Sequence, residues 1–77
     1  MNKARRARIE EAASMVEQAM QIIEECRDEE REAFDNMSEG LQNSERGQKI
    51  GENADTLEEA YDAIEGAVGD LRSVTEG

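Results

Sequence analysis

Eight residues in the middle of the sequence carry side chains that suit the binding of a small anion. Four are basic and four are small and polar: Arg27, Arg31, Arg46 and Lys49, and Asn36, Gln42, Asn43 and Ser44. Guanidinium, ammonium, amide and hydroxyl groups donate hydrogen bonds, and the charged donors make the stronger bonds to phosphate and carboxylate oxygens. These residues are therefore the predicted ligand-binding residues. The structural alternative is that the basic ones only form surface ion pairs with the carboxylates of Glu30, Glu32, Asp35 and Glu45.

Catalytic and metal-binding chemistry has few candidates in this sequence. There is no histidine, and Cys26 is the only cysteine, so neither an imidazole base nor a His-activated thiol can be built. Carboxylate pairs such as Glu24–Glu25 are adjacent in sequence, and adjacent side chains on a helix diverge by about 100°. The stretch "SERGQKIG" lacks the spacing of a phosphate-binding P-loop. We therefore expect a protein that is not an enzyme, with no catalytic residues, no metal and no cofactor.

The segments that would position these residues are helical. The chain has 77 residues, no proline, no tryptophan and 36% hydrophobic residues, and helix-forming residues dominate it. Ile9, Val16 and Ile23 recur every seven residues, with Cys26 continuing the same apolar stripe, which predicts a helix over about 3–36.

A second apolar stripe predicts a second helix over about 44–74. It contains Ile50, Leu57, Ile64 and Leu71, again seven residues apart. Thr56 with Glu59 also forms a capping-box pattern, so a later start of this helix is the alternative.

The two stripes fit one antiparallel hairpin. Its matching pairs are Ile9 with Leu71, Val16 with Ile64, and Ile23 with Leu57. They are symmetric about Gly40, which predicts a turn near 37–43 with Gly40 as a pivot of positive φ. The same register places Glu30 opposite Ile50. The predicted fold is all-α, with residues 1–77 as a single helical-hairpin domain.

An isolated hairpin with so few large apolar residues would be marginally stable, which favours self-association. Small residues on the second helix allow another helix to approach closely. The predicted oligomer contacts are Ala60, Ala63, Gly66 and Ala67. We expect a homo-oligomeric helical bundle, of which a dimer is the simplest form.

The charge is strongly negative and unevenly distributed. The net charge is −11, and four of the nine basic residues lie within the first eight positions, so the rest of the chain carries 5 − 20 = −15. Such a body should repel nucleic acid and anionic membranes. The basic start is expected to lie beside the acidic end of the second helix. With one cysteine and no apolar run near the roughly 20 residues of a membrane span, we expect a cytoplasmic protein.

About half of the chain resembles a group of short acidic proteins encoded by bacteriophages and prophages. The resemblance rests on "EEREAFDNMSEGLQNSERGQKI" and "LEEAYDAIEGAVGDL". Within these stretches the shared features are Ala33–Asn36, Leu41–Gln42, Ser44–Arg46, and the repeats from Leu57 onward. The family often has a proline after the Asn-Met step, where this chain has Ser38.

The resemblance implies a small helical protein in the cytoplasm of an infected bacterium. Proteins of this kind are often counter-defence factors, and some sequester the nucleotide signals of bacterial immune systems. Our leading hypothesis is therefore a non-enzymatic protein that captures a nucleotide-type anion. The alternatives are an acidic DNA mimic that inhibits a host restriction or CRISPR nuclease, and a structural or assembly protein without a small ligand.

Overall fold

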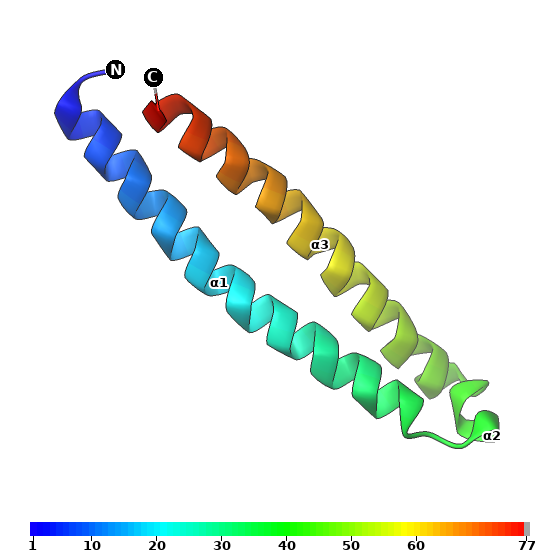
Figure 1. Ribbon diagram of the computed structural model, residues 1–77. Coiled ribbons are helices and arrows are strands. Elements are labelled where there is room, and N and C mark those ends of the chain that lie inside the picture. Colours follow the sequence, from blue (N-terminus) through cyan, green and yellow to red (C-terminus); the bar gives the residue numbers. More distant parts are fainter. Residues whose placement is uncertain (77) are drawn as a thin grey trace.

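The computed structural model describes residues 1–76, and the regular secondary structure in this range is helical. Helix α1 spans Lys3–Asp35, the one-turn helix α2 spans Glu39–Gln42, and α3 spans Glu45–Glu76. The two long helices lie side by side, with α2 at one end of the molecule and both termini at the other (Figure 1). The predicted all-α hairpin is confirmed. Gly77, which the predicted domain includes, lies outside the described residues.

Short polar side chains begin each helix, because the first N–H groups of a helix have no acceptor within it. The Oδ1 atom of Asn2 accepts a hydrogen bond from the N–H of Arg5 at 2.7 Å. Ser38 caps α2. At the start of α3, the Oγ atom of Ser44 accepts from the N–H of Gly47 at 3.1 Å. The alternative start near Thr56 is therefore wrong, since Thr56 lies inside α3.

The chain reverses without the pivot that was predicted at Gly40. Gly40 lies within α2, and no residue in 1–76 has a positive φ. Instead, the extended backbone of Ser38, with φ −63° and ψ 158°, separates α1 from α2, and a second break at Asn43 and Ser44 separates α2 from α3. Because the reversal is spread over two breaks, no left-handed residue is needed.

The glycine that the turn does require is Gly47, in the first turn of α3. Gly47 is buried, and a Cβ atom added to it would lie 2.1 Å from the carbonyl oxygen of Leu41 and 2.9 Å from the Cα of Gln42. Only a residue without a side chain lets α2 lie this close to α3.

The apolar core between α1 and α3 is thin. The buried hydrophobic residues are Ala13, Met20 and Ala54. Cys26 was predicted on the apolar stripe but is exposed, because it lies about 120° around the helix from Met20 and about 140° from Ala13. The molecule is a rod of 58 × 14 × 13 Å. Its radius of gyration is 17.3 Å, whereas a globular chain of this length has about 11.5 Å.

Side-chain contacts between the long helices are shifted from the predicted pairing. Glu30 was predicted opposite Ile50, but its Oε2 atom accepts a hydrogen bond at 3.4 Å from the Nδ2 atom of Asn53. Side chains on a helix lean toward its N-terminus, so in an antiparallel pair the two sets lean in opposite directions. Side chains that touch therefore belong to residues further toward the C-terminus of each helix than the residues that lie level with each other. Neither long helix in residues 1–76 contains an apolar stretch that would cross a membrane.

Candidate functional site

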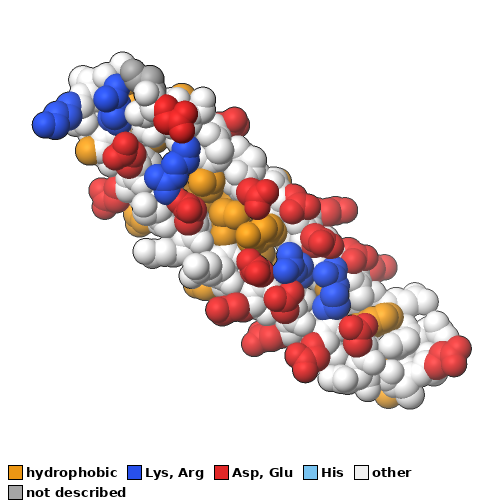
Figure 2. Space-filling model, viewed as in Figure 1, with side chains coloured by type: hydrophobic (Ala, Val, Ile, Leu, Met, Phe, Trp, Pro, Cys, Tyr) orange, Lys and Arg blue, Asp and Glu red, His pale blue; other side chains and the backbone are white. Residues whose placement is uncertain are grey.

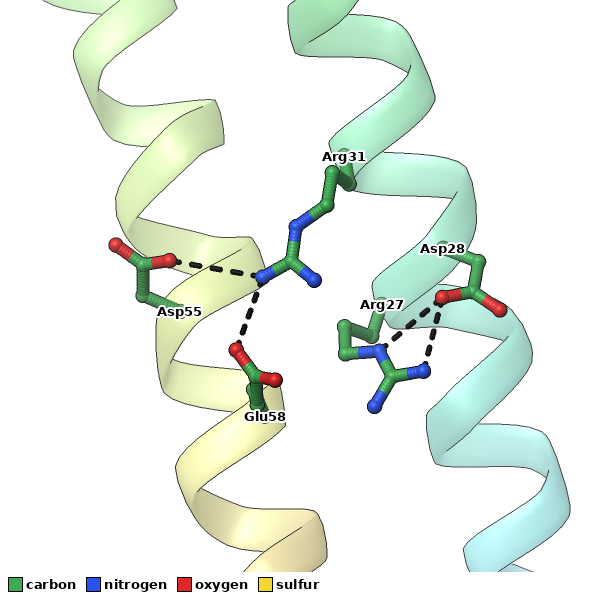
Figure 3. A network of polar contacts seen from close by, with 5 residues as sticks. All are labelled: Arg27, Asp28, Arg31, Asp55 and Glu58. Atoms are coloured by element: carbon green, nitrogen blue, oxygen red, sulfur yellow. Dashed lines mark hydrogen bonds and ion pairs between the residues drawn. The ribbon is translucent and has the colours of Figure 1, made fainter.

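One broad side of the rod carries ion pairs that bridge the two long helices. The Nη2 atom of Arg31 on α1 lies 3.1 Å from Oε2 of Glu58 and 3.7 Å from Oδ1 of Asp55, both on α3 (Figure 3). Nearer the termini, Arg72 pairs with Glu17. Acidic and basic side chains are interspersed over both long helices on the face that Figure 2 shows.

Arg27 is held by groups of the protein itself. Its Nε and Nη2 atoms donate to Oδ1 of Asp28 at 3.1 and 3.0 Å, a hydrogen bond that raises the pKa of Arg27 above its usual value (Figure 3). Its guanidinium carbon lies 5.6 Å from the ring centre of Tyr61, within cation–π range. Burial, and then the nearby carboxylate of Glu24, raises the pKa of the Tyr61 phenol. The positive charges of Arg27 and Arg31 thus already face carboxylates.

Arg46 and Lys49 have a different environment, at the turn end of α3. They line an open depression of about 780 Å³, together with Ser44, Glu45, Gln48, Ile50 and Glu52. Both side chains are exposed, and within residues 1–76 neither takes part in an ion pair. They are thus cations available to a ligand in a strongly acidic protein.

The start of α3 lies at this depression, since Ser44, Glu45 and Arg46 are among its lining residues. Ser44 already uses its hydroxyl, which accepts from Gly47 and donates to the carbonyl oxygen of Leu41 at 2.5 Å. The N–H groups of Glu45 and Arg46 have no hydrogen-bond acceptor within α3, because these residues belong to its first turn. A helix N-terminus carries partial positive charge and favours anions. The carboxylates of Glu45 and Glu52 oppose this effect and restrict an anion to the part of the depression nearest the two cations.

The three predicted amide residues have structural positions around the turn. Gln42 donates from its Nε2 atom to the carbonyl oxygen of Phe34 at 2.9 Å, which ties α2 to the end of α1. Asn36 and Asn43 are the C-caps of α1 and α2, and both are exposed. Gln42 and Asn43 also line a neighbouring depression that shares two residues, Gln48 and Glu52, with the first.

The structure therefore divides the predicted ligand-binding set. Ser44, Arg46 and Lys49 share one depression, and Gln42 and Asn43 adjoin it. Arg27 and Arg31 lie further along the rod, in ion pairs. Four residues of the depression are not among the predicted ligand-binding residues: Glu45, Gln48, Ile50 and Glu52. Three of them, Glu45, Gln48 and Glu52, lie three or four residues from Lys49 or Glu45 on one helix, which was the signal that would have found them. Ile50 does not have this spacing.

The predicted oligomer contacts on α3 do not all face the same way. Ala60 is half-buried, whereas Ala63, Gly66 and Ala67 are exposed. Gly66 lies two residues from both Ile64 and Val68 of the inward stripe, so it faces away from α1. A Cβ atom added to Gly66 would meet nothing within 4 Å.

Comparisons with known proteins do not place the chain in a family, because no family model, no curated protein and no solved structure matches it. Within residues 1–76, no three Cys, Asp or Glu side chains are grouped so that they would hold a metal ion.

Proposed function

We propose that this protein is a non-enzymatic binding protein that captures a small nucleotide-type anion at the turn end of α3. Arg46 and Lys49 supply the charges, and the amides of Glu45 and Arg46 supply backbone donors. Gln42 and Asn43 lie near enough to meet the rest of the ligand. In the phage setting that the sequence resemblance implies, such capture would remove a nucleotide signal from a bacterial immune response.

The observation that carries the proposal is the position of two unpaired cations, Arg46 and Lys49, beside an open depression at the start of α3. Of the nine basic residues, Arg27, Arg31 and Arg72 form ion pairs within residues 1–76, and the other six do not. Four of these six lie in the first turns of α1 and line neither of the two depressions described above: Lys3, Arg5, Arg6 and Arg8. Two neighbouring unpaired cations at a helix start and beside a depression favour binding of an external anion.

The exposure of the site limits what each contact contributes. An exposed ion pair contributes about 0–1 kcal/mol. Arg46 and Lys49, with two backbone amides, therefore supply only part of the roughly 8 kcal/mol that a micromolar dissociation constant represents. Since the depression is open, contacts from the ligand's base or ribose would have to offset the entropy lost on binding.

The proposal is tested by calorimetric titration of the wild-type protein with cyclic nucleotides, cyclic dinucleotides and ADP-ribose. We expect one of them to bind at micromolar concentration. The double variant Arg46→Ala, Lys49→Ala should weaken that binding by about tenfold or more, or about 1.4 kcal/mol. The matched control is Lys3→Ala, Arg5→Ala at the other end of the rod, which removes the same charge and should bind like the wild type. If no ligand binds, or if the two variants lose affinity equally, the proposal is wrong.

A second candidate function is the binding of a basic protein groove by the acidic surface. The ion-paired side of each long helix repeats carboxylates, some of which take part in the ion pairs: Glu10, Glu17, Glu24, Asp28 and Asp35 on α1, and Asp55, Glu58, Asp62 and Glu65 on α3. On α3 they recur about once per turn, or about every 5 Å, whereas on α1 they recur about every 9 Å. Together the two helices carry roughly one carboxylate per 3.3 Å, about half the charge density of duplex DNA, and the paired arginines neutralise part of it.

This candidate predicts that the protein inhibits a DNA-binding nuclease, and that inhibition weakens steeply as salt is raised. A suitable variant is Asp62→Asn, Glu65→Gln, because neither side chain takes part in an ion pair within residues 1–76. It should reduce inhibition of the nuclease without changing the affinity for nucleotides. Inhibition that is insensitive both to salt and to this variant would exclude DNA mimicry.

A further inference from the structure

A second apolar row runs along α1 outside the contact with α3. It contains Ala12, Met15, Ala19, Ile22 and Cys26, all of them exposed. Met15 is 62% exposed and Ile22 63% exposed, which is high for large apolar side chains. Their alternating spacing of three and four residues is that of a helix face that packs against another helix. Each member directly precedes a residue of the inward stripe, such as Val16 or Ile23.

Helix α3 carries a corresponding row of smaller side chains. It contains Ala60, Ala63, Ala67 and Val74, with Asp70 at the position between the last two; Ala60 is half-buried and the others are exposed. These residues also directly precede residues of the inward stripe, such as Tyr61, Ile64 and Val68. The two rows therefore have the same position relative to the contact between the helices.

The ion pairs show that equivalent positions on the two helices face the same way. Arg31 and Glu58, like Glu17 and Arg72, are cross-helix partners, and each of the four directly follows an inward position. In an antiparallel pair, the residues that follow the inward stripe share one broad side, so the residues that precede it share the opposite side. The two apolar rows thus form one surface, which we call the apolar face, on the side opposite the ion pairs.

The chain exposes more surface than a folded monomer of its mass usually does. Its accessible surface is 5672 Å² for 8.6 kDa, whereas a folded monomer of that mass exposes about 4,700 Å². The excess of about 1,000 Å² is comparable to the roughly 800 Å² that each partner buries in a standard stable interface. One broad side of a rod 58 Å long and 14 Å wide has an area of this order, so a second copy lying along the apolar face would cover enough surface for a stable interface.

We propose that a second copy of this chain docks on the apolar face, so that two hairpins form a four-helix bundle. The face is self-complementary in size, since the α1 row carries the bulky Met15 and Ile22 and the α3 row carries alanines. A two-fold axis along the rod places the bulky row of each copy over the alanine row of the other. The ion-paired sides then face outward on both copies. This proposal does not depend on anion binding.

The test measures molecular mass by sedimentation equilibrium on matched variants. The wild type should have twice the 8.6 kDa mass of one chain. Ile22→Glu places a charge on the apolar face and should give the mass of one chain. Gln21→Glu adds the same charge at the neighbouring exposed position, on the ion-paired side, and should leave the dimer intact. A wild type of single-chain mass at all concentrations, or a dimer that Ile22→Glu leaves unchanged, would overturn the proposal.

A second measurement applies even if the Ile22→Glu chain does not fold. Cys26 lies on the apolar face and is exposed in the single chain. In the wild type, its reaction with a thiol reagent should slow as protein concentration rises through the dimer's dissociation constant. The Gln21→Glu variant should show the same dependence. A reaction rate constant independent of protein concentration, equal to that of an unhindered thiol, would contradict docking on this face. Both readouts are independent of nucleotide binding, so either proposal can fail without the other.

Discussion

Replacing Gly47 by alanine should destabilise the hairpin, although alanine is the better helix former. The added Cβ atom would lie 2.1 Å from the carbonyl oxygen of Leu41, whereas ordinary contact begins at 3.4 Å. Helix α2 would therefore have to move by about 1.3 Å away from α3. The clash is with backbone, so no side-chain rotation can relieve it.

The size of the effect follows from the contacts that this movement disturbs. Ser44 would lose its bond to Leu41 at 2.5 Å, worth about 1 kcal/mol, and its cap on Gly47 at 3.1 Å, worth about another 1 kcal/mol. Residual overpacking lowers the free energy of unfolding by about 1 kcal/mol more, and the higher helix propensity of alanine raises it by about the same amount. The expected net loss is about 2 kcal/mol, which for a chain of this size lowers the melting temperature by roughly 10 °C.

Thermal unfolding followed by circular dichroism, at one protein concentration for all variants, measures this loss. The matched control is Gly69→Ala, since a Cβ atom at Gly69 would meet nothing within 4 Å. That variant should be more stable by about 0.5–1 kcal/mol. If Gly47→Ala is as stable as Gly69→Ala, then α2 does not pack on α3 as described, and the reasoning about the turn is refuted.

Three further outcomes are expected. Ser44→Ala should lower the free energy of unfolding by about 1–2 kcal/mol, because it removes both the cap of α3 and the hydrogen bond to Leu41. Denaturant unfolding measures this loss, and an unchanged midpoint would contradict the capping role. Arg31→Met should cost less than about 1 kcal/mol, because the Arg31 side chain is 41% exposed, and raising the salt concentration should reduce the difference from the wild type. Tyr61 is the only tyrosine, and a spectrophotometric titration should show its phenol titrating with a midpoint above 10, which Glu24→Gln should lower. Because the pKa of this phenol is higher in the folded protein than in the unfolded chain, it contributes stability below pH 10 that is lost as the pH rises through the pKa of the folded protein.

The hairpin was predictable because its signal is repeated along the whole chain. Recurrence every seven residues, as in Ile9, Val16 and Ile23, identifies a helix without knowledge of its neighbours. Two apolar stripes of similar length, joined by a short turn, can bury each other most simply as an antiparallel pair of helices. The start of α3 was also predictable, since Ser44 has the chemistry of a cap.

The turn was less predictable because glycine has two distinct uses. Gly40 stands at the centre of symmetry, and its freedom to adopt positive φ suggested a pivot. The chain instead uses Gly47 for the close approach of α2, a requirement that depends on contacts between segments and leaves no local pattern. Cys26 was misplaced for a related reason, since each helix carries two adjacent apolar rows and spacing alone does not show which row faces inward.

The candidate site was predictable only in part. The sequence brings Arg27, Arg31, Arg46 and Lys49 to the same half of the hairpin, but the side of the rod on which each lies depends on helix rotation. Arg31 faces the carboxylate of Glu58, whereas Arg46 and Lys49 face a depression at the turn end. Which cations remain available to a ligand is therefore a property of the packed structure.

The most direct measurement of the proposed function is an amide proton–nitrogen correlation spectrum of the labelled protein, titrated with ADP-ribose and with a cyclic dinucleotide. One of them should shift the amide signals of Glu45, Arg46 and Lys49 and reach saturation at micromolar concentration. Signals near Arg5 and Arg8, at the other basic end, should not move. Shifts confined to that N-terminal end, or no shifts with either ligand, would contradict the proposed function.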